Sequence, residues 1–175
     1  MVAAFVGNQT WFTVLLVTHV FGAIMGLGPT FAFAIIGPAI GKQESPQASL
    51  ALMEIMEKIE KGIVLPILLI FQLGSGILLI FNRGLNVGFF TSHRAWLLAG
   101  IGVYLAAMVI SMFIDVPAMG RLIHMAKGGQ AGTPEFAKNV KITQSLGPVL
   151  TVMALAIMLL MIWKPGSGCG ALLRC

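Results

Sequence analysis

The stretch FTVLLVTHVFGAIMGLGPTFAFAII, from Phe12 to Ile36, decides the fold of this chain. It contains no Asp, Glu, Lys or Arg, and it is longer than the roughly 20 apolar residues that a helix needs to cross the hydrocarbon core of a bilayer. Three more segments of the same kind follow, at residues 63–81, 95–114 and 146–163. Because these segments are apolar on all sides and do not alternate, they predict transmembrane helices and exclude the strands of a barrel.

The composition of the 175-residue chain is that of a membrane protein, with 58% hydrophobic types, 10% charged types and a mean hydropathy of +0.95. We expect an all-α integral membrane four-helix bundle over residues 1–166 and a tail containing Gly and Cys over residues 167–175. The net charge of +5 would suit a nucleic-acid-binding protein. The basic residues flank the apolar segments, however, so we expect the lipid bilayer as a partner and no nucleic acid.

The distribution of Lys and Arg predicts the orientation of the spans. Seven of these residues fall in the first and third connections, whereas four fall in the second connection and the tail. The positive-inside rule then places both termini outside the cytoplasm. Trp11, Trp96 and Trp163 stand at the span ends that would share the outer face. We therefore expect a multi-pass protein of the bacterial cytoplasmic (inner) membrane with both termini extracytoplasmic.

The first and third connections carry signals for helix starts. Ser45 before Pro46 and Thr133 before Pro134 each combine a capping hydroxyl with a proline in the first turn. We therefore expect amphipathic cytoplasmic extensions of the second and fourth transmembrane helices. In the extension of the second helix, the apolar residues that we expect to face the core are Leu52, Met56, Ile59 and Ile63. The charged residues that we expect to face solvent are Glu54, Glu57, Lys58, Glu60 and Lys61.

One ionisable residue lies clearly within a span. His19 is eight residues past Trp11, which puts it about 12 Å below the outer interface. Gly22, Ala23 and Gly26 follow on roughly the same side of the helix and form a strip without bulk. Such a strip accepts either a second helix, with the histidine hydrogen-bonded, or a tetrapyrrole whose metal the imidazole binds. Both alternatives stay open at this point.

Other residues would complete a haem site around His19. Arg83 and Arg94 lie at the interface above it and would hold the propionates. Met158 is near the same depth on the fourth span, and His93 would reach the iron only if its loop dips inward. We expect no catalytic residue, His19 as the metal ligand, and a cofactor-binding set made of His19, Gly22, Gly26, Arg83, Arg94, His93 and Met158.

The remaining polar residues of the spans have plainer interpretations. Gln72 and Ser75 are expected to make interhelical hydrogen bonds. Asp115, at the end of the third span, either relays protons or pairs with Arg121 or Lys127. No span shows the paired charges or the Gly- and Pro-interrupted helices that solute pathways usually need, which disfavours transport.

Two motifs carry a family resemblance. The stretch THVFGAIMGLG, Thr18 to Gly28, and the closing MIWKPG, Met161 to Gly166, resemble the predicted bacterial integral membrane proteins of domain of unknown function twenty-two sixty-nine. More distantly, the first span is similar to that of the CopD copper-resistance proteins and the HemJ protoporphyrinogen oxidases. The HemJ resemblance implies haem b held by His19. Those enzymes also rely on a basic residue within the bundle, which these spans lack, so porphyrinogen oxidation is not implied.

Two classes of function follow from these residues. The first is a haem b-binding membrane protein with an electron-transfer or redox role. The second is an accessory or structural subunit of a larger respiratory or photosynthetic complex, either without a cofactor or holding a chlorophyll-type pigment. Its partners would be other membrane-protein subunits or a second copy of the chain. Whether the protein is an enzyme stays open, as does a disulfide between Cys169 and Cys175.

Overall fold

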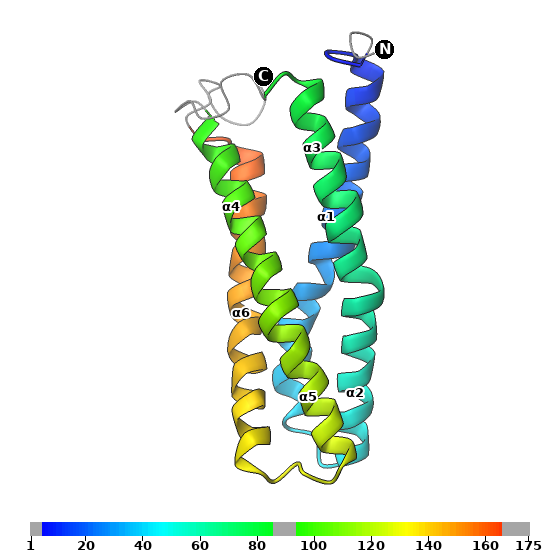
Figure 1. The fold of residues 1–175 in the computed structure, drawn as a ribbon, viewed down its shortest axis with the longest axis vertical. Helices are drawn as coiled ribbons and strands as arrows, with labels where there is room; N and C mark the ends of the chain where they lie inside the picture. The colour runs from blue at the N-terminus through cyan, green and yellow to red at the C-terminus, as the bar shows by residue number, and fades with distance from the viewer. Residues whose placement is uncertain (1–4, 86–93, 166–175) are drawn as a thin grey trace.

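The computed structural model describes residues 5–85 and 94–165, and it is an all-α four-helix bundle, as the sequence predicts (Figure 1). Its four helices long and apolar enough to cross a membrane are Gln9–Ile40, Pro46–Asn82, Ala95–Lys127 and Pro134–Trp163. They have 30 to 37 residues each and are therefore longer than the hydrocarbon core requires. The predicted tail at residues 167–175 and His93 lie outside the described residues.

Two of the four spans contain π-helical segments. The first span is α1 (Gln9–Ile40) and the fourth is α6 (Pro134–Trp163). The second span runs through α2 (Pro46–Ile59), the π-helical η2 (Glu60–Val64) and η3 (Ile67–Gln72), and α3 (Leu73–Asn82). The third runs through α4 (Ala95–Ile110), the π-helical η5 (Ser111–Asp115) and α5 (Val116–Lys127).

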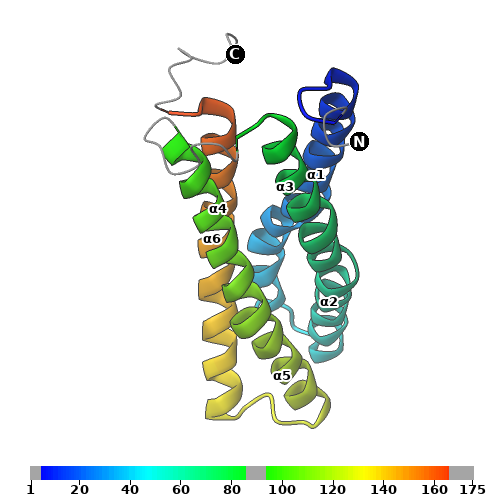
Figure 2. The same cartoon turned by 45° about the horizontal axis from the view of Figure 1, so that its top comes forward.

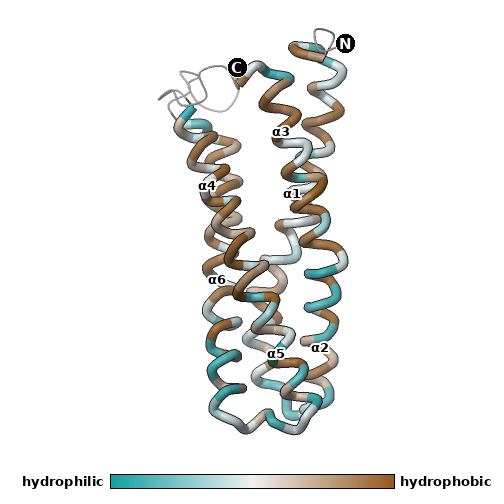
Figure 3. Tube along the Cα trace, in the orientation of Figure 1, coloured by the Kyte–Doolittle hydropathy of each residue, from teal (hydrophilic) through white to brown (hydrophobic). Residues whose placement is uncertain are grey.

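The two ends of the bundle differ in composition. The start of α1, the start of α4 and the end of α6 lie together at the upper end of Figure 1, which we call the tryptophan end because it holds Trp11, Trp96 and Trp163. Here the Lys164 ammonium lies 5.8 Å from the centroid of the Trp96 ring. The opposite end, where α1 turns into α2 and α5 turns into α6, is called the lysine end. Figure 3 shows hydrophilic residues concentrated there.

The predicted helix starts at the lysine end are confirmed. The Ser45 hydroxyl oxygen accepts a hydrogen bond from the Ala48 amide at 3.3 Å, and that of Thr133 accepts one from the Phe136 amide at 3.2 Å. Each cap satisfies an amide that the first helical turn would leave without a partner. The second and fourth helices therefore begin well before the apolar segments that identified them.

The π-helical segments change which face of the second span is buried. A line of buried residues recurs every four positions, whereas an α-helix has about 3.6 residues per turn and only wider turns keep such a line on one side. The expectation that Glu60 faces solvent and Ile63 faces the core is therefore wrong: Glu60 is 8% exposed and Ile63 is 41% exposed. The buried residues of this line are Met56, Glu60, Val64, Leu68 and Gln72.

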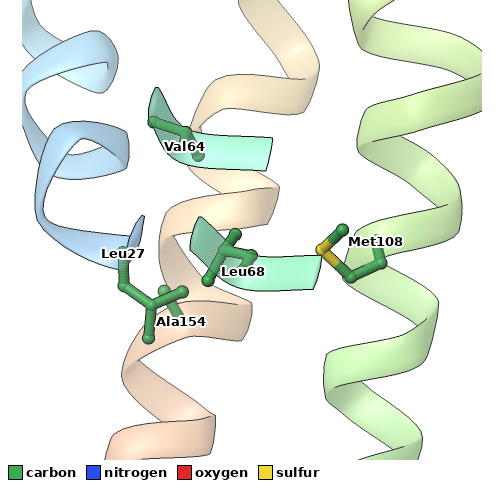
Figure 4. Packing of buried hydrophobic residues seen from close by; sticks show 5 residues of the cluster. All are labelled: Leu27, Val64, Leu68, Met108 and Ala154. Carbon is green, nitrogen blue, oxygen red and sulfur yellow. The ribbon is translucent and has the colours of Figure 1, made fainter. Parts of the chain in front are cut away.

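The spans pack in pairs that meet near the centre of the bundle. The first span packs on η3, α3 and α6, while α4 and α5 both pack on α6 and α5 also contacts α2 (Figures 1 and 2). The Tyr104 hydroxyl of α4 donates to the Leu68 carbonyl oxygen at 2.7 Å and ties the third span to η3. The central core cluster takes residues from every span: Leu27, Val64, Leu68, Met108 and Ala154 (Figure 4).

At the tryptophan end, Asn82 at the end of α3 is hydrogen-bonded to residues just before α1. Its side chain is fully buried, and its Nδ2 donates to the Phe5 carbonyl oxygen at 2.6 Å. The Gly7 amide donates to the Asn82 carbonyl oxygen at 2.8 Å. The next residue, Asn8, caps α1 through its side-chain oxygen. The first two spans are therefore joined at this end by contacts of their own.

Candidate functional site

Both ring nitrogens of His19 are paired with side chains of the second span. Its Nδ1 lies 3.0 Å from the Ser75 hydroxyl oxygen, and its Nε2 lies 3.0 Å from the Gln72 side-chain nitrogen. The Ser75 hydroxyl donates to the Phe71 carbonyl oxygen, so its oxygen is left to accept from Nδ1–H. Nε2 then accepts from the Gln72 amide, which fits a neutral imidazole. The predicted interhelical hydrogen bonds of Gln72 and Ser75 are confirmed.

The strip of small residues beside His19 faces η3. A Cβ on Gly22 would lie 2.9 Å from the Gln72 Oε1 atom, and one on Gly26 would lie 2.5 Å from a Leu68 methyl carbon. A side chain larger than hydrogen would therefore force the Gln72 or Leu68 side chain out of its present position. Side chains of the second span occupy the space beside Gly22 and Gly26, which is the helix-packing use of such a strip.

The residues around His19 do not fit a haem or a chlorophyll in this arrangement. A tetrapyrrole would need one imidazole nitrogen for its metal and a flat space along Gly22 and Gly26. Gln72 and Leu68 fill that space, and Gln72 and Ser75 take both nitrogens. Within residues 5–85 and 94–165, no group of three or more His, Cys, Asp or Glu side chains could hold a metal ion.

The other predicted haem contacts do not gather around His19. The Arg83 guanidinium carbon lies 3.5 Å from the centroid of the Phe12 ring, a cation–π contact at the tryptophan end. Arg94 donates to a backbone carbonyl oxygen nine residues before it. Met158 lies on α6 and is 39% exposed, so it is not among the buried residues of that helix. Of the predicted cofactor-binding residues that lie in the described part of the chain, the structure brings together only His19, Gly22 and Gly26.

A cavity of about 610 Å³ lies at the lysine end, between residues of all four spans. Its volume is in the range of roughly 300–1,000 Å³ that is typical of small-molecule sites, and most of its wall is apolar. A smaller cavity of about 70 Å³ continues toward the central core. The apolar wall of the larger cavity includes Phe33, Met53, Met56, Met119, Leu122 and Phe136, and the residues that line both cavities are Phe33, Glu60, Asp115 and Gly147.

Two carboxyl groups stand where the two cavities meet. Glu60 is the first residue of η2 and Asp115 is the last of η5, so they come from different spans. The Ser111 hydroxyl, at the start of η5, donates to the Glu60 Oε1 atom at 2.8 Å. This hydrogen bond holds the two π-helical segments against each other. Irregular turns of this kind are frequent at functional sites, because they redirect side chains that a regular helix would place elsewhere.

Neither carboxyl group has a cationic partner in the part of the chain that the structure describes. The Lys127 ammonium lies 2.7 Å from Glu54, and Lys61 pairs with Glu57 at 2.6 Å. The expectation that Asp115 pairs with Arg121 or Lys127 is therefore wrong, because Lys127 reaches across to α2 instead. Ionisable groups without an ion-pair partner are costly in an apolar wall, and they mark candidate functional sites.

The sequence reasoning missed this site for two reasons. It assigned Glu60 to the solvent face because it assumed regular helical turns. It found no grouped charges because it considered each span separately, whereas the fold places Glu60 and Asp115, which belong to different spans, in the walls of the same two cavities. Residues four positions apart, such as Met56, Glu60 and Val64, also lie near one another on a regular helix, so their spacing in the sequence does not reveal the π-helical segments.

Four apolar helices packed around a core that they share define a multi-pass integral membrane protein. The chain belongs to the family described as predicted integral membrane protein (DUF2269), which matches residues 13–165 and confirms the family resemblance. No curated protein and no solved structure matches the chain. The more distant similarity to CopD and HemJ proteins stays a prediction.

Proposed function

We propose that this protein binds a small, largely apolar molecule in the lysine-end cavity and holds no resident haem. The cavity carries the proposal, because its volume of about 610 Å³ and its predominantly apolar wall are those of a small-molecule site. In the bacterial inner membrane and the orientation that the sequence predicts, the cavity would lie on the cytoplasmic side.

The helix irregularities of the bundle support this proposal. Pro38 of α1 and Pro148 of α6 line the cavity, and the π-helical η2 and η5 each contribute a carboxyl group to it. Proline removes a backbone hydrogen bond and bends a helix, and a π-turn widens it. Each of the four spans thus places either a proline or a π-helical segment beside the same space.

The two functions expected from the sequence make different predictions for the purified protein. Haem binding would require Gln72 and Leu68 to leave His19 and the glycine strip, and it would give a Soret band that His19→Ala removes. An accessory role would give stoichiometric co-purification of other membrane subunits. The contacts of His19 with Gln72 and Ser75 favour a protein without haem.

The experiment fills the cavity and measures binding of a neutral probe. Gly37 of α1 lines the cavity, and no atom lies within 4 Å of the position of an added Cβ, so Gly37→Phe can enter the space. Gly28 is the matched control, because it is also followed by proline in α1 and has the same open surroundings but does not line the cavity. The probe is N-phenyl-1-naphthylamine, added to protein in lipid nanodiscs.

We expect saturable binding of the probe, above that of empty nanodiscs, to weaken about tenfold or more in Gly37→Phe, since the ring removes space from the site. Gly28→Phe should bind like the unaltered protein. Absence of saturable binding, or an equal loss in both variants, would overturn the proposal.

A further inference from the structure

The charges of the lysine-end cavity do not balance. Its charged lining residues are Glu60, Asp115 and Lys127. The Lys127 ammonium is already in an ion pair with Glu54, which does not line the cavity. Glu60 is only 8% exposed and receives a hydrogen bond from the uncharged Ser111. Within residues 5–85 and 94–165, these two acidic groups therefore have no cation in an ion pair with them.

The two acids line the same part of the cavity from different helices. Both line the larger and the smaller cavity, so they stand at the deep end of the larger one. The hydrogen bond between Ser111 and Glu60, at 2.8 Å, keeps the second and third spans together at this level. A ligand with its polar end there would have its remaining surface against the apolar wall.

That wall suits an organic cation. Phe33, Met53, Met56 and Met119 line the cavity. Aromatic faces attract cations, and thioethers are polarisable and adapt to irregular shapes. A small inorganic ion would have to exchange its water shell for several oxygen ligands, and the described residues hold no group of three or more His, Cys, Asp or Glu side chains to supply them.

We propose that the cavity selects an amphipathic organic cation, namely an amine, quaternary ammonium or phosphonium with an apolar body. Its positive group lies at Glu60 and Asp115, and its body fills the space toward the lysine end. This inference rests on the proposed small-molecule site, and it adds the charge that the site selects.

The test compares two probes of the same shape and opposite charge, tetraphenylphosphonium and tetraphenylborate. Their binding to the full chain in lipid nanodiscs is measured by equilibrium dialysis, with empty nanodiscs subtracted. We expect the phosphonium to bind at least about tenfold more tightly than the borate. Glu60→Gln and Asp115→Asn should each weaken phosphonium binding by about tenfold, because each removes one of the two carboxyl groups whose negative form would balance the bound cation.

Two controls separate loss of charge from loss of fold. Glu57→Gln changes an acid one turn before Glu60 that pairs with Lys61 and does not line the cavity, so phosphonium binding should not change. The neutral N-phenyl-1-naphthylamine should bind Glu60→Gln and Asp115→Asn as it binds the unaltered chain. If Glu60→Gln loses the neutral probe as well, its site is no longer intact, and the effect of Asp115→Asn on phosphonium binding then supports or overturns the cation inference.

The outcomes distinguish this inference from the proposed function. Suppose that the neutral probe binds and that Gly37→Phe weakens this binding. If the phosphonium is then not preferred over the borate, or if the acid variants have no effect, the cation inference alone is overturned. Absence of saturable binding for every probe removes the small-molecule site and the cation inference with it.

Discussion

The contact between His19 and Gln72 can be measured as a coupling free energy. Gln72→Leu removes the amide that lies 3.0 Å from the His19 Nε2 atom and leaves that nitrogen without a donor. Interhelical hydrogen bonds in membranes contribute about 0.6 kcal/mol on average and up to about 1.7 kcal/mol. The value here should be in the upper half of that range, because the Gln72 side chain is buried and the glycine strip keeps the two spans close.

A double-mutant cycle gives this free energy directly. The variants Gln72→Leu, His19→Leu and their combination are unfolded in mixed micelles with increasing dodecyl sulfate, and tryptophan fluorescence reports the transition. We expect a coupling free energy of about 1–1.5 kcal/mol. The matched control combines Gln72→Leu with His124→Leu, whose histidine is exposed on α5, and it should be additive within about 0.3 kcal/mol.

A coupling free energy of His19 with Gln72 as small as that of the control would refute this reasoning. The hydrogen bond would then be absent in the membrane, and the imidazole would be available for another partner. A Soret band that appears in Gln72→Leu and disappears with His19→Leu would point to haem as that partner.

Three further predictions concern other contacts of the bundle. Gly26→Val should destabilise the protein by about 1–3 kcal/mol in the same unfolding assay, because an added Cβ would lie 2.5 Å from a Leu68 methyl carbon. Asn82→Ala should cost about 1 kcal/mol and speed hydrogen exchange near Phe5, whose carbonyl oxygen loses its 2.6 Å donor; unchanged exchange would contradict this. Thr133→Ala should cost about 1 kcal/mol and speed exchange in the first turn of α6, whereas Thr133→Ser should retain protection.

Much of the fold could be predicted because it depends on local sequence. The length of each apolar segment sets a span, and the capping hydroxyls of Ser45 and Thr133 set the starts of the second and fourth helices. Gln72 and Ser75 could be assigned to interhelical hydrogen bonds because polar side chains within a bilayer need partners. These features require no knowledge of how the spans are arranged.

The candidate site could not be predicted because it depends on contacts between spans. The wider turns of η2 and η3 coincide with bonds to the third span, from Ser111 to Glu60 and from Tyr104 to the Leu68 carbonyl oxygen. No local pattern shows these partners. Without them, regular turns are the natural assumption, and Glu60 is then placed on the wrong face.

The arrangement of hydrogen bonds has a consequence for how the protein is made. His19, Ser75 and the side-chain amide nitrogens of Gln72 and Asn82 find partners within residues 5–85, so the first two spans can leave the translocon as a pair with these hydrogen bonds already formed. Glu60 receives the hydrogen bond of Ser111 from the third span, which emerges later from the ribosome. The lysine-end cavity is thus completed by the second half of the nascent chain, and a truncated product would insert without it.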